Sequence, residues 1–289
     1  MLAHSIALGL LAVFVAAPTP IRHHDSVHKD IAALRRQIAT SPAPASLHLA
    51  IADLERRQGH VIDARRELKL AERAGALPFQ IEGQLAACAM AEGDFEASEQ
   101  LLTSLLRDRP GDLPARRMRA QVRTRSHKHL AAACDLASIR EADPDAFSQE
   151  DALALADALA KAGHLQASIS SLDRVLQRSA LQGSARSAVL IQRAVELETE
   201  LGAFAAALRR TETMCAAGVA PHVVAALRGD LYLALGQSER ARTEWQAAAT
   251  ALRPVVRRRR RSGALRRDLA LLENKLARLA PSIPTPSRQ

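Results

Sequence analysis

Apolar residues recur at intervals of three and four along most of the chain, the spacing that puts them on one face of an α-helix. The last helical run shows it most clearly, with Leu265, Leu269, Leu272, Leu276 and Leu279. Runs of β-branched residues are short, which argues against a sheet. The pattern therefore predicts an all-α chain with helices at 25–40, 46–58, 60–75, 79–92, 94–108, 113–126, 128–142, 148–162, 164–178, 184–201, 203–217, 221–235, 237–252 and 263–280.

Twelve of these helices form six pairs, because a turn position recurs at steps of 34, 34, 36, 39 and 34 residues. Glycine adopts the left-handed conformation that ends a helix at such a turn at little cost. A small residue seven positions earlier, in every pair but the fifth, lets the two helices approach closely. A period of this length indicates stacked helical hairpins, each too small to bury its own apolar face. The turn positions are Gly59, Gly93, His127, Gly163, Gly202 and Gly236, and the earlier positions are Ala52, Ala86, Ala120, Ala156, Val195 and Gly229.

The sixth pair, from Pro221 to Pro254, carries the most distinctive set of residues: Leu227, Gly229, Tyr232, Gly236, Ala241, Trp245 and Ala248. These identities and spacings resemble the tetratricopeptide repeat (TPR) family, and the resemblance extends over residues 45–254. It implies a right-handed α-solenoid of about six TPR-like hairpins. Helices 25–40 and 263–280 would cap its ends, since exposed terminal repeats need a cover. Asp25 and Ser26 are the expected N-cap of the first helix.

The TPR resemblance also implies a function, because in this family the first helix of each pair lines a groove for extended peptides or partner helices. We therefore expect a non-enzymatic scaffold that binds a protein or peptide partner. The alternative for each polar residue on these helices is that it is simply solvated. The candidate groove residues are Arg56, Arg117, Gln121, Arg125, Asp157, Gln192, Glu196 and Asp230.

The net charge of +9 is concentrated at the end of the chain. Residues 250–289 contain 11 Lys and Arg but 2 Asp and Glu, so the preceding 249 residues are neutral overall. Five consecutive arginines, Arg257, Arg258, Arg259, Arg260 and Arg261, could bind an anionic surface such as lipid, lipopolysaccharide or nucleic acid by neutralising phosphates. The alternative is a solvated basic stretch. No aromatic stacking residues accompany the run, so specific nucleic-acid recognition is not expected.

The apolar run at residues 6–17 is too short for an ordinary membrane span and fits the core of a secretory signal peptide. We expect a periplasmic or secreted protein, with an uncleaved membrane anchor and a cytosolic protein as alternatives. The expected organisation is 1–17 signal peptide or apolar segment, 18–44 linker and capping helix, 45–254 repeat array, 255–280 arginine-rich segment and capping helix, and 281–289 disordered tail.

Residues suited to catalysis or metal binding are sparse. His24 and His28 have a possible metal-ligand spacing, but no further ligand is evident nearby in the sequence, so an exposed polar start is expected. Cys88, Cys134 and Cys215 form no C-x-x-C pair and are expected to be small buried residues. The chain has no phosphate-binding loop, nucleophile elbow or metalloprotease motif. We therefore expect no catalysis, no cofactor and no metal.

Overall fold

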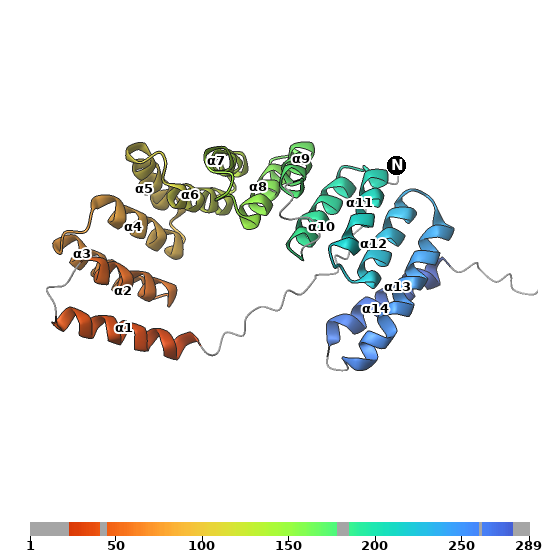
Figure 1. Cartoon of the computed structure of the whole chain (residues 1–289), viewed down its shortest axis with the longest axis horizontal. Coiled ribbons are helices and arrows are strands. Elements are labelled where there is room, and N and C mark those ends of the chain that lie inside the picture. Colours follow the sequence, from red (N-terminus) through yellow and green to blue (C-terminus); the bar gives the residue numbers. More distant parts are fainter. Residues whose placement is uncertain (1–22, 41–44, 178–184, 260–261, 280–289) are drawn as a thin grey trace, which may run out of the picture. The chain divides into compact units, whose positions relative to one another are not determined.

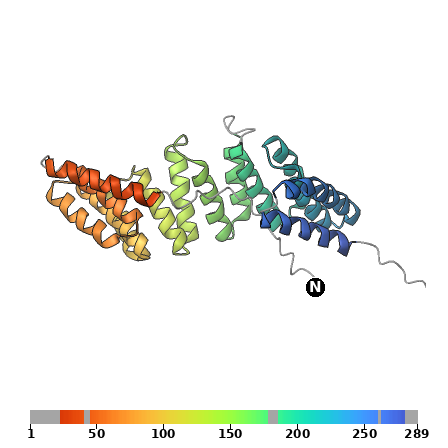
Figure 2. The same ribbon diagram turned by 90° about the horizontal axis from the view of Figure 1, so that it is seen from below.

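The computed structural model describes residues 23–40, 45–177, 185–259 and 262–279. Every regular element in these residues is an α-helix, which confirms the predicted all-α class. The helices form two compact units that meet between His164 and Leu165 in the sequence. We call them the amino-terminal unit (α1–α8) and the carboxy-terminal unit (α9–α14). Within each unit, helices that follow one another in the chain lie side by side (Figures 1 and 2).

The helix bounds agree with the predicted pairs to within a few residues at most ends. The amino-terminal unit contains α1 (His23–Thr40), α2 (Ala45–Arg57), α3 (Val61–Arg73), α4 (Pro78–Glu92), α5 (Phe95–Asp108), α6 (Leu113–Arg125), α7 (His129–Ala142) and α8 (Gln149–Lys161). The carboxy-terminal unit contains α9 (Leu165–Leu176), α10 (Ala185–Glu200), α11 (Phe204–Ala216), α12 (Pro221–Ala234), α13 (Ser238–Arg258) and α14 (Gly263–Arg278). In the amino-terminal unit, the first helices α2, α4 and α6 also contact one another in succession.

The six predicted turn positions all have left-handed backbone, with φ between 59° at His127 and 85° at Gly59 and Gly163. His127 is the one non-glycine residue with positive φ in the described part of the chain. Its backbone N–H still donates to the Thr124 carbonyl at 3.2 Å, as Gly59 does to Arg56 at 3.0 Å. The third hairpin therefore has the same turn as the other five. Its left-handed backbone is unfavourable for a residue with a β-carbon, such as His127.

Replacing His127 with glycine is expected to stabilise the protein by about 0.5–1 kcal/mol, because it removes this strain at the cost of some chain entropy. Urea unfolding followed by circular dichroism measures the change. The matched control is Gly59→Ala, which introduces the same strain in the first hairpin and should destabilise by about 1 kcal/mol. A neutral or destabilising His127→Gly would mean that the imidazole itself supports the turn.

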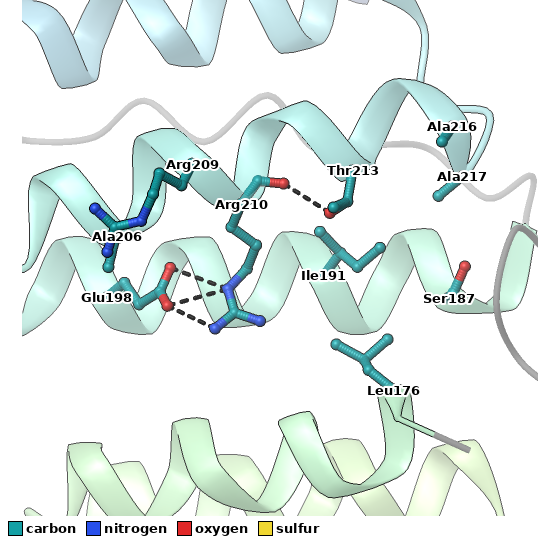
Figure 3. Close-up of a pocket in the computed structure, with 10 residues that line it drawn as sticks. All are labelled: Leu176, Ser187, Ile191, Glu198, Ala206, Arg209, Arg210, Thr213, Ala216 and Ala217. Carbon is teal, nitrogen blue, oxygen red and sulfur yellow. Dashed lines mark hydrogen bonds and ion pairs between the residues drawn. The ribbon is translucent and has the colours of Figure 1, made fainter. Parts of the chain in front are cut away.

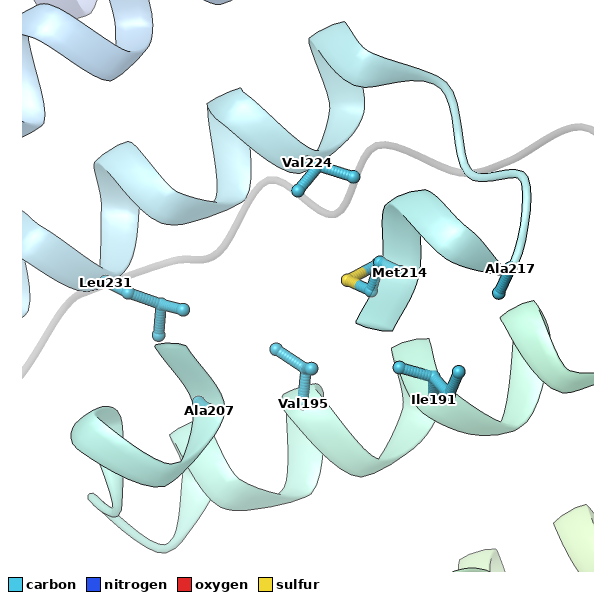
Figure 4. Packing of buried hydrophobic residues seen from close by; sticks show 7 residues of the cluster. All are labelled: Ile191, Val195, Ala207, Met214, Ala217, Val224 and Leu231. Atoms are coloured by element: carbon cyan, nitrogen blue, oxygen red, sulfur yellow. The ribbon is translucent and has the colours of Figure 1, made fainter. Parts of the chain in front are cut away.

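The apolar core of the carboxy-terminal unit lies between successive hairpins (Figure 4). Its buried members come from three helices and include Val195 on α10, Met214 on α11 and Leu231 on α12. Met214 is fully buried, so α11 packs against both of its neighbours. This is the packing expected of repeats that complete one another's cores.

The small residue of the sixth hairpin allows a close contact between its helices. A β-carbon on Gly229 would lie 2.3 Å from Cδ1 of Trp245, so the indole ring rests directly against the α12 backbone. The indole Nε1–H donates to Asp230 Oδ1 at 3.0 Å. Lys275 Nζ from α14 reaches the same oxygen at 2.6 Å. Leu272 of α14 is buried in the same core cluster as Trp245, which places the closing helix against the last hairpin.

Three expectations about local structure were wrong. The expected caps Asp25 and Ser26 lie inside helix α1. Helix α13 continues through Pro254 to Arg258. Val255 and Val256 pack against the Leu272 cluster, and this apolar contact outweighs the tendency of proline to end a helix.

The third wrong expectation concerns two cysteines, since Cys88 is buried but Cys134 and Cys215 are exposed. On α7 the buried positions include Ala132, Ala133 and Leu136. Cys134 is two residues from Ala132, about 200° around the helix, and so faces away from this side.

Candidate functional site

Two predicted groove residues of the amino-terminal unit are arginines held by carboxylates of the same unit. Arg56 on α2 donates to Asp53 Oδ1 at 2.6 Å. Arg117 on α6 donates from Nε to both oxygens of Asp151 on α8, at 2.9 and 2.8 Å, and from Nη2 to the Ala146 carbonyl. Arg117 therefore joins two successive first helices, which is a structural contribution regardless of any partner.

Two of the remaining predicted residues of this unit are more accessible. Gln121 and Arg125 are exposed on α6, and Asp157 is half-buried on α8. Gln121 and Arg125 are four residues apart and so lie on one side of the helix. They are the predicted residues of this unit that are best placed to meet a partner.

In the carboxy-terminal unit, the predicted residues Gln192 and Glu196 lie one turn apart on α10. Gln192 Nε2 donates to Glu196 Oε1 at 3.4 Å, and Arg193 pairs with Glu196 Oε2 at 3.0 Å. The third, Asp230, is engaged by Trp245 and Lys275 as described above. The assignment of all eight residues to partner binding stays a prediction.

An ion-pair network around the buried Asp135 joins α5, α6 and α7. Asp135 on α7 accepts from Arg119 Nη2 at 2.7 Å and Nε at 3.0 Å, and from Arg123 Nη1 at 2.8 Å. Arg123 Nε also reaches Glu99 Oε1 on α5 at 2.8 Å. Burial alone would raise the pKa of Glu99, but hydrogen bonds from Lys128 and Arg123 hold that pKa below its ordinary value. The network therefore keeps Glu99 ionised and links two hairpins.

A second network joins α9, α10 and α11 around Arg210. Its Nη2 reaches Glu198 Oε1 at 2.6 Å, and its Nη1 reaches Asp173 Oδ1 at 2.6 Å. Burial alone would lower the pKa of Arg210, but the hydrogen bonds to Glu198 and Asp173 raise it well above its ordinary value. Arg210 therefore remains charged.

The two networks occupy the same repeat positions with the charges exchanged. Arg123 and Asp135 lie four residues before and eight after the turn position His127, and Glu198 and Arg210 lie at the same offsets from Gly202. Sequence reasoning had treated charged residues as surface features and missed this pairing. Opposite charges at these two offsets would have been the signal.

The described pocket with the most apolar character lies beside the Arg210 network (Figure 3). We call it the α10–α11 pocket; its volume is about 550 Å³. Leu176 and Ile191 form one apolar part, and the Glu198–Arg210 pair forms a polar part. Its other lining residues are Ser187, Ala206, Arg209, Thr213, Ala216 and Ala217.

The basic segment begins on a helix, because α13 includes Arg257 and Arg258. These two residues and Arg259 are exposed. Arg260 and Arg261 lie outside the described residues. Arg266 and Arg267, in the first turns of α14, are also exposed. The described arginines therefore add positive charge at the junction of α13 and α14.

Comparison with known proteins agrees with this architecture. The family model of the tetratricopeptide repeat-like domain matches residues 115–269, more than half of the chain. The chain belongs to this TPR-like family. Its members are generally non-enzymatic repeat scaffolds for protein interaction. No curated protein sequence matches the chain.

Solved structures resemble this TPR-like chain at low sequence identity, which shows the fold alone. A tetratricopeptide repeat protein from Parabacteroides merdae ATCC 43184 has a TM-score of 0.50 and 17% identity, over 88% of this chain and 93% of that one. The MamA protein has a TM-score of 0.50 and 16% identity, over 60% of this chain and 91% of that one. The structure of Naa15/Naa10 bound to HypK-THB has a TM-score of 0.53 and 16% identity, over 91% of this chain and 38% of that one.

None of the helices in the described residues is both long and apolar enough to cross a bilayer. The apolar run at residues 6–17 and the expected tail at 281–289 lie outside the described residues.

Proposed function

We propose that this TPR-like chain is an exported, non-enzymatic scaffold whose α10–α11 pocket receives one apolar side chain of a protein or peptide partner. The observation that carries the proposal is the pocket itself, which combines an apolar part at Leu176 and Ile191 with the fixed Glu198–Arg210 pair. A partner side chain buried there gains hydrophobic free energy without disturbing that pair. A volume of about 550 Å³ leaves room for a large side chain.

The charges around the pocket also favour an extended partner. Arg209 is an exposed cation among the lining residues. Glu196 lies on α10, the helix that supplies Ile191 to the pocket, and is half-buried. A flanking acidic group of a bound segment therefore has a partner in Arg209. Such contacts contribute more to specificity than to affinity.

Blocking the pocket tests the proposal. A crosslinking pull-down from the native host supplies the partner, and its affinity for the purified chain is then measured. Ala216→Trp fills the pocket mouth with an indole and is expected to weaken binding about 10- to 100-fold, the equivalent of losing one buried apolar side chain. The matched control is Ala251→Trp at an exposed site on α13, which should bind like the parent.

Two further variants test the predicted groove residues in each unit. Glu196→Arg reverses a charge on α10 and is expected to weaken binding, as is Arg125→Glu on α6 if the amino-terminal unit contributes. Parental affinity in Ala216→Trp would contradict a role for the pocket, whatever the other variants do.

A polyanion-binding function through Arg257–Arg261 is a second candidate, and the exposure of Arg257, Arg258 and Arg259 favours it. Binding to phosphatidylglycerol vesicles should then fall steeply with salt and on replacing these three arginines by alanine. Partner binding that resists salt and survives those replacements would support the scaffold function instead.

Export is supported by the apolar run at residues 6–17 and the small residues that end it. The protein isolated from its host is then expected to begin near Pro18, which intact mass spectrometry checks. A full-length mass in the cytosolic fraction would contradict export.

A further inference from the structure

A second pocket, in the amino-terminal unit, gathers titratable side chains from three helices. It has a volume of about 620 Å³ and lies among α1, α2 and the start of α3. His28 of α1, Glu55 of α2, and His60 and Asp63 at the start of α3 all line it. The sequence had left His28 without a further ligand, and the fold supplies three candidates.

Three of these residues bring metal-binding atoms close together. One ligand atom each from Glu55, His60 and Asp63 lie within 4.8 Å of one another. His60 Nδ1 is already 3.0 Å from Glu55 Oε2. Zinc binds imidazole nitrogen and carboxylate oxygen at about 2.0–2.2 Å, so two of its ligands lie about 3.3–3.5 Å apart. Rotations of the exposed side chains of His60 and Asp63 would close the remaining gap.

Glu55 is held in place from its other side. Arg35 of α1 pairs with Glu55 Oε1 at 3.1 Å and lies 3.7 Å from Glu67 Oε1. Glu67 in turn meets His48 Nδ1 at 2.8 Å through its second oxygen. These contacts leave Glu55 Oε2 as the oxygen directed to His60. Such second contacts orient a metal-binding carboxylate.

The first hairpin differs from the third and fifth at the positions four residues before and eight residues after the turn. In the third and fifth hairpins these two positions carry opposite charges, but in the first both are carboxylates, Glu55 and Glu67. Asp63 adds a third carboxylate, and the cations facing the cluster are Arg35 and Arg66. Apart from its histidines, this cluster of three carboxylates and two arginines therefore retains one negative charge, which a divalent cation would neutralise.

We propose that Glu55, His60 and Asp63 bind one divalent transition-metal ion of the Zn²⁺ class, with His28 as a fourth ligand from α1. Mixed imidazole and carboxylate ligands suit zinc and its neighbours rather than calcium or magnesium. An ion bound in this way would fasten the terminal helix α1 to the first hairpin. It would complement the Arg35 contacts that hold the helix there in the structure.

Zinc titration of the full chain tests the site. The purified, tag-free and chelator-treated protein is titrated with ZnCl₂ by isothermal calorimetry, and one site per chain is expected. His60→Ala and Asp63→Asn should each weaken binding at least tenfold. Both side chains are exposed, so these variants should fold, and circular dichroism verifies this.

The matched control is His164→Ala. His164 follows the turn position of the fourth hairpin as His60 follows that of the first, but Leu159 and Ala167 replace the two carboxylates there. Its zinc affinity should equal that of the parent. Absence of a zinc site, or equal affinity in His60→Ala and the parent, would overturn the proposal.

The contribution of α1 has its own readout. Zinc should slow amide hydrogen exchange in α1 of the parent, and His28→Ala should reduce both this protection and the affinity. An unchanged affinity in His28→Ala, with binding lost in His60→Ala, would restrict the site to the three residues of the first hairpin and refute the link to α1.

Discussion

Replacing Gly229 with alanine is expected to destabilise the carboxy-terminal unit by about 3 kcal/mol or more. The added β-carbon would lie 2.3 Å from Trp245 Cδ1 and 2.4 Å from its Nε1, closer than any real contact. The indole is 2% exposed and its Nε1–H is bonded to Asp230, so moving the ring away would disturb its packing and break that hydrogen bond. Overpacking of this kind usually costs about 1–3 kcal/mol, and the lost hydrogen bond adds to it.

Urea unfolding followed by circular dichroism measures this loss, and the fluorescence of Trp245, the single tryptophan of the chain, follows the carboxy-terminal unit. Gly83→Ala is the matched control, because Gly83 is also inside a helix but its added β-carbon would meet Leu105 Cδ1 at 3.6 Å. That substitution should be neutral or stabilise by up to about 1 kcal/mol through helix propensity. Equal effects of the two substitutions would contradict the close contact as the cause.

The second large effect is expected for Asp135→Ala, which should destabilise the amino-terminal unit by about 3–5 kcal/mol. Asp135 is 3% exposed and is the carboxylate that Arg119 and Arg123 share. Removing it leaves two neighbouring guanidinium groups without that counter-charge. The loss therefore exceeds that of an ordinary surface ion pair, which is about 0–1 kcal/mol.

Hydrogen exchange of α6 and α7 localises this loss, and circular dichroism follows the whole unfolding transition. The control is Asp145→Ala, which lies at an exposed site in the loop after α7 and should change stability by less than about 0.5 kcal/mol. A triple variant, Asp135→Leu with Arg119→Met and Arg123→Leu, should recover most of the stability, because it removes the charges together and Glu99 keeps its bond to Lys128. A small effect of Asp135→Ala alone would mean that water compensates the arginines.

The hairpin architecture could be predicted from the sequence because its signals are local. The turn positions recur at nearly constant steps, and each adopts the left-handed backbone, including His127. The close approach at Gly229 followed from the same reasoning about small residues. The pockets could not be predicted, since each combines side chains from three helices whose relative placement depends on packing.

The contacts of individual polar side chains are the part that the sequence specified least. Arg117 and Asp230 are predicted groove residues, and the structure shows in addition that each joins helices of the chain. Cys134 was expected to be buried but is exposed. The groove residues were chosen from the TPR resemblance and the cysteines from their apolar neighbours in the sequence, and neither determines which side of a helix meets a neighbour.

The sequence by itself determined the helices, their pairing and the turns between them, because backbone hydrogen bonds and φ preferences act over a few residues. Only the tertiary structure decided which charges neutralise one another and which histidines and carboxylates share a pocket. Arg35 and Glu55, or Asp173 and Arg210, are far apart in the chain and meet only when neighbouring helices pack. Their chemistry is a property of the contacts between helices.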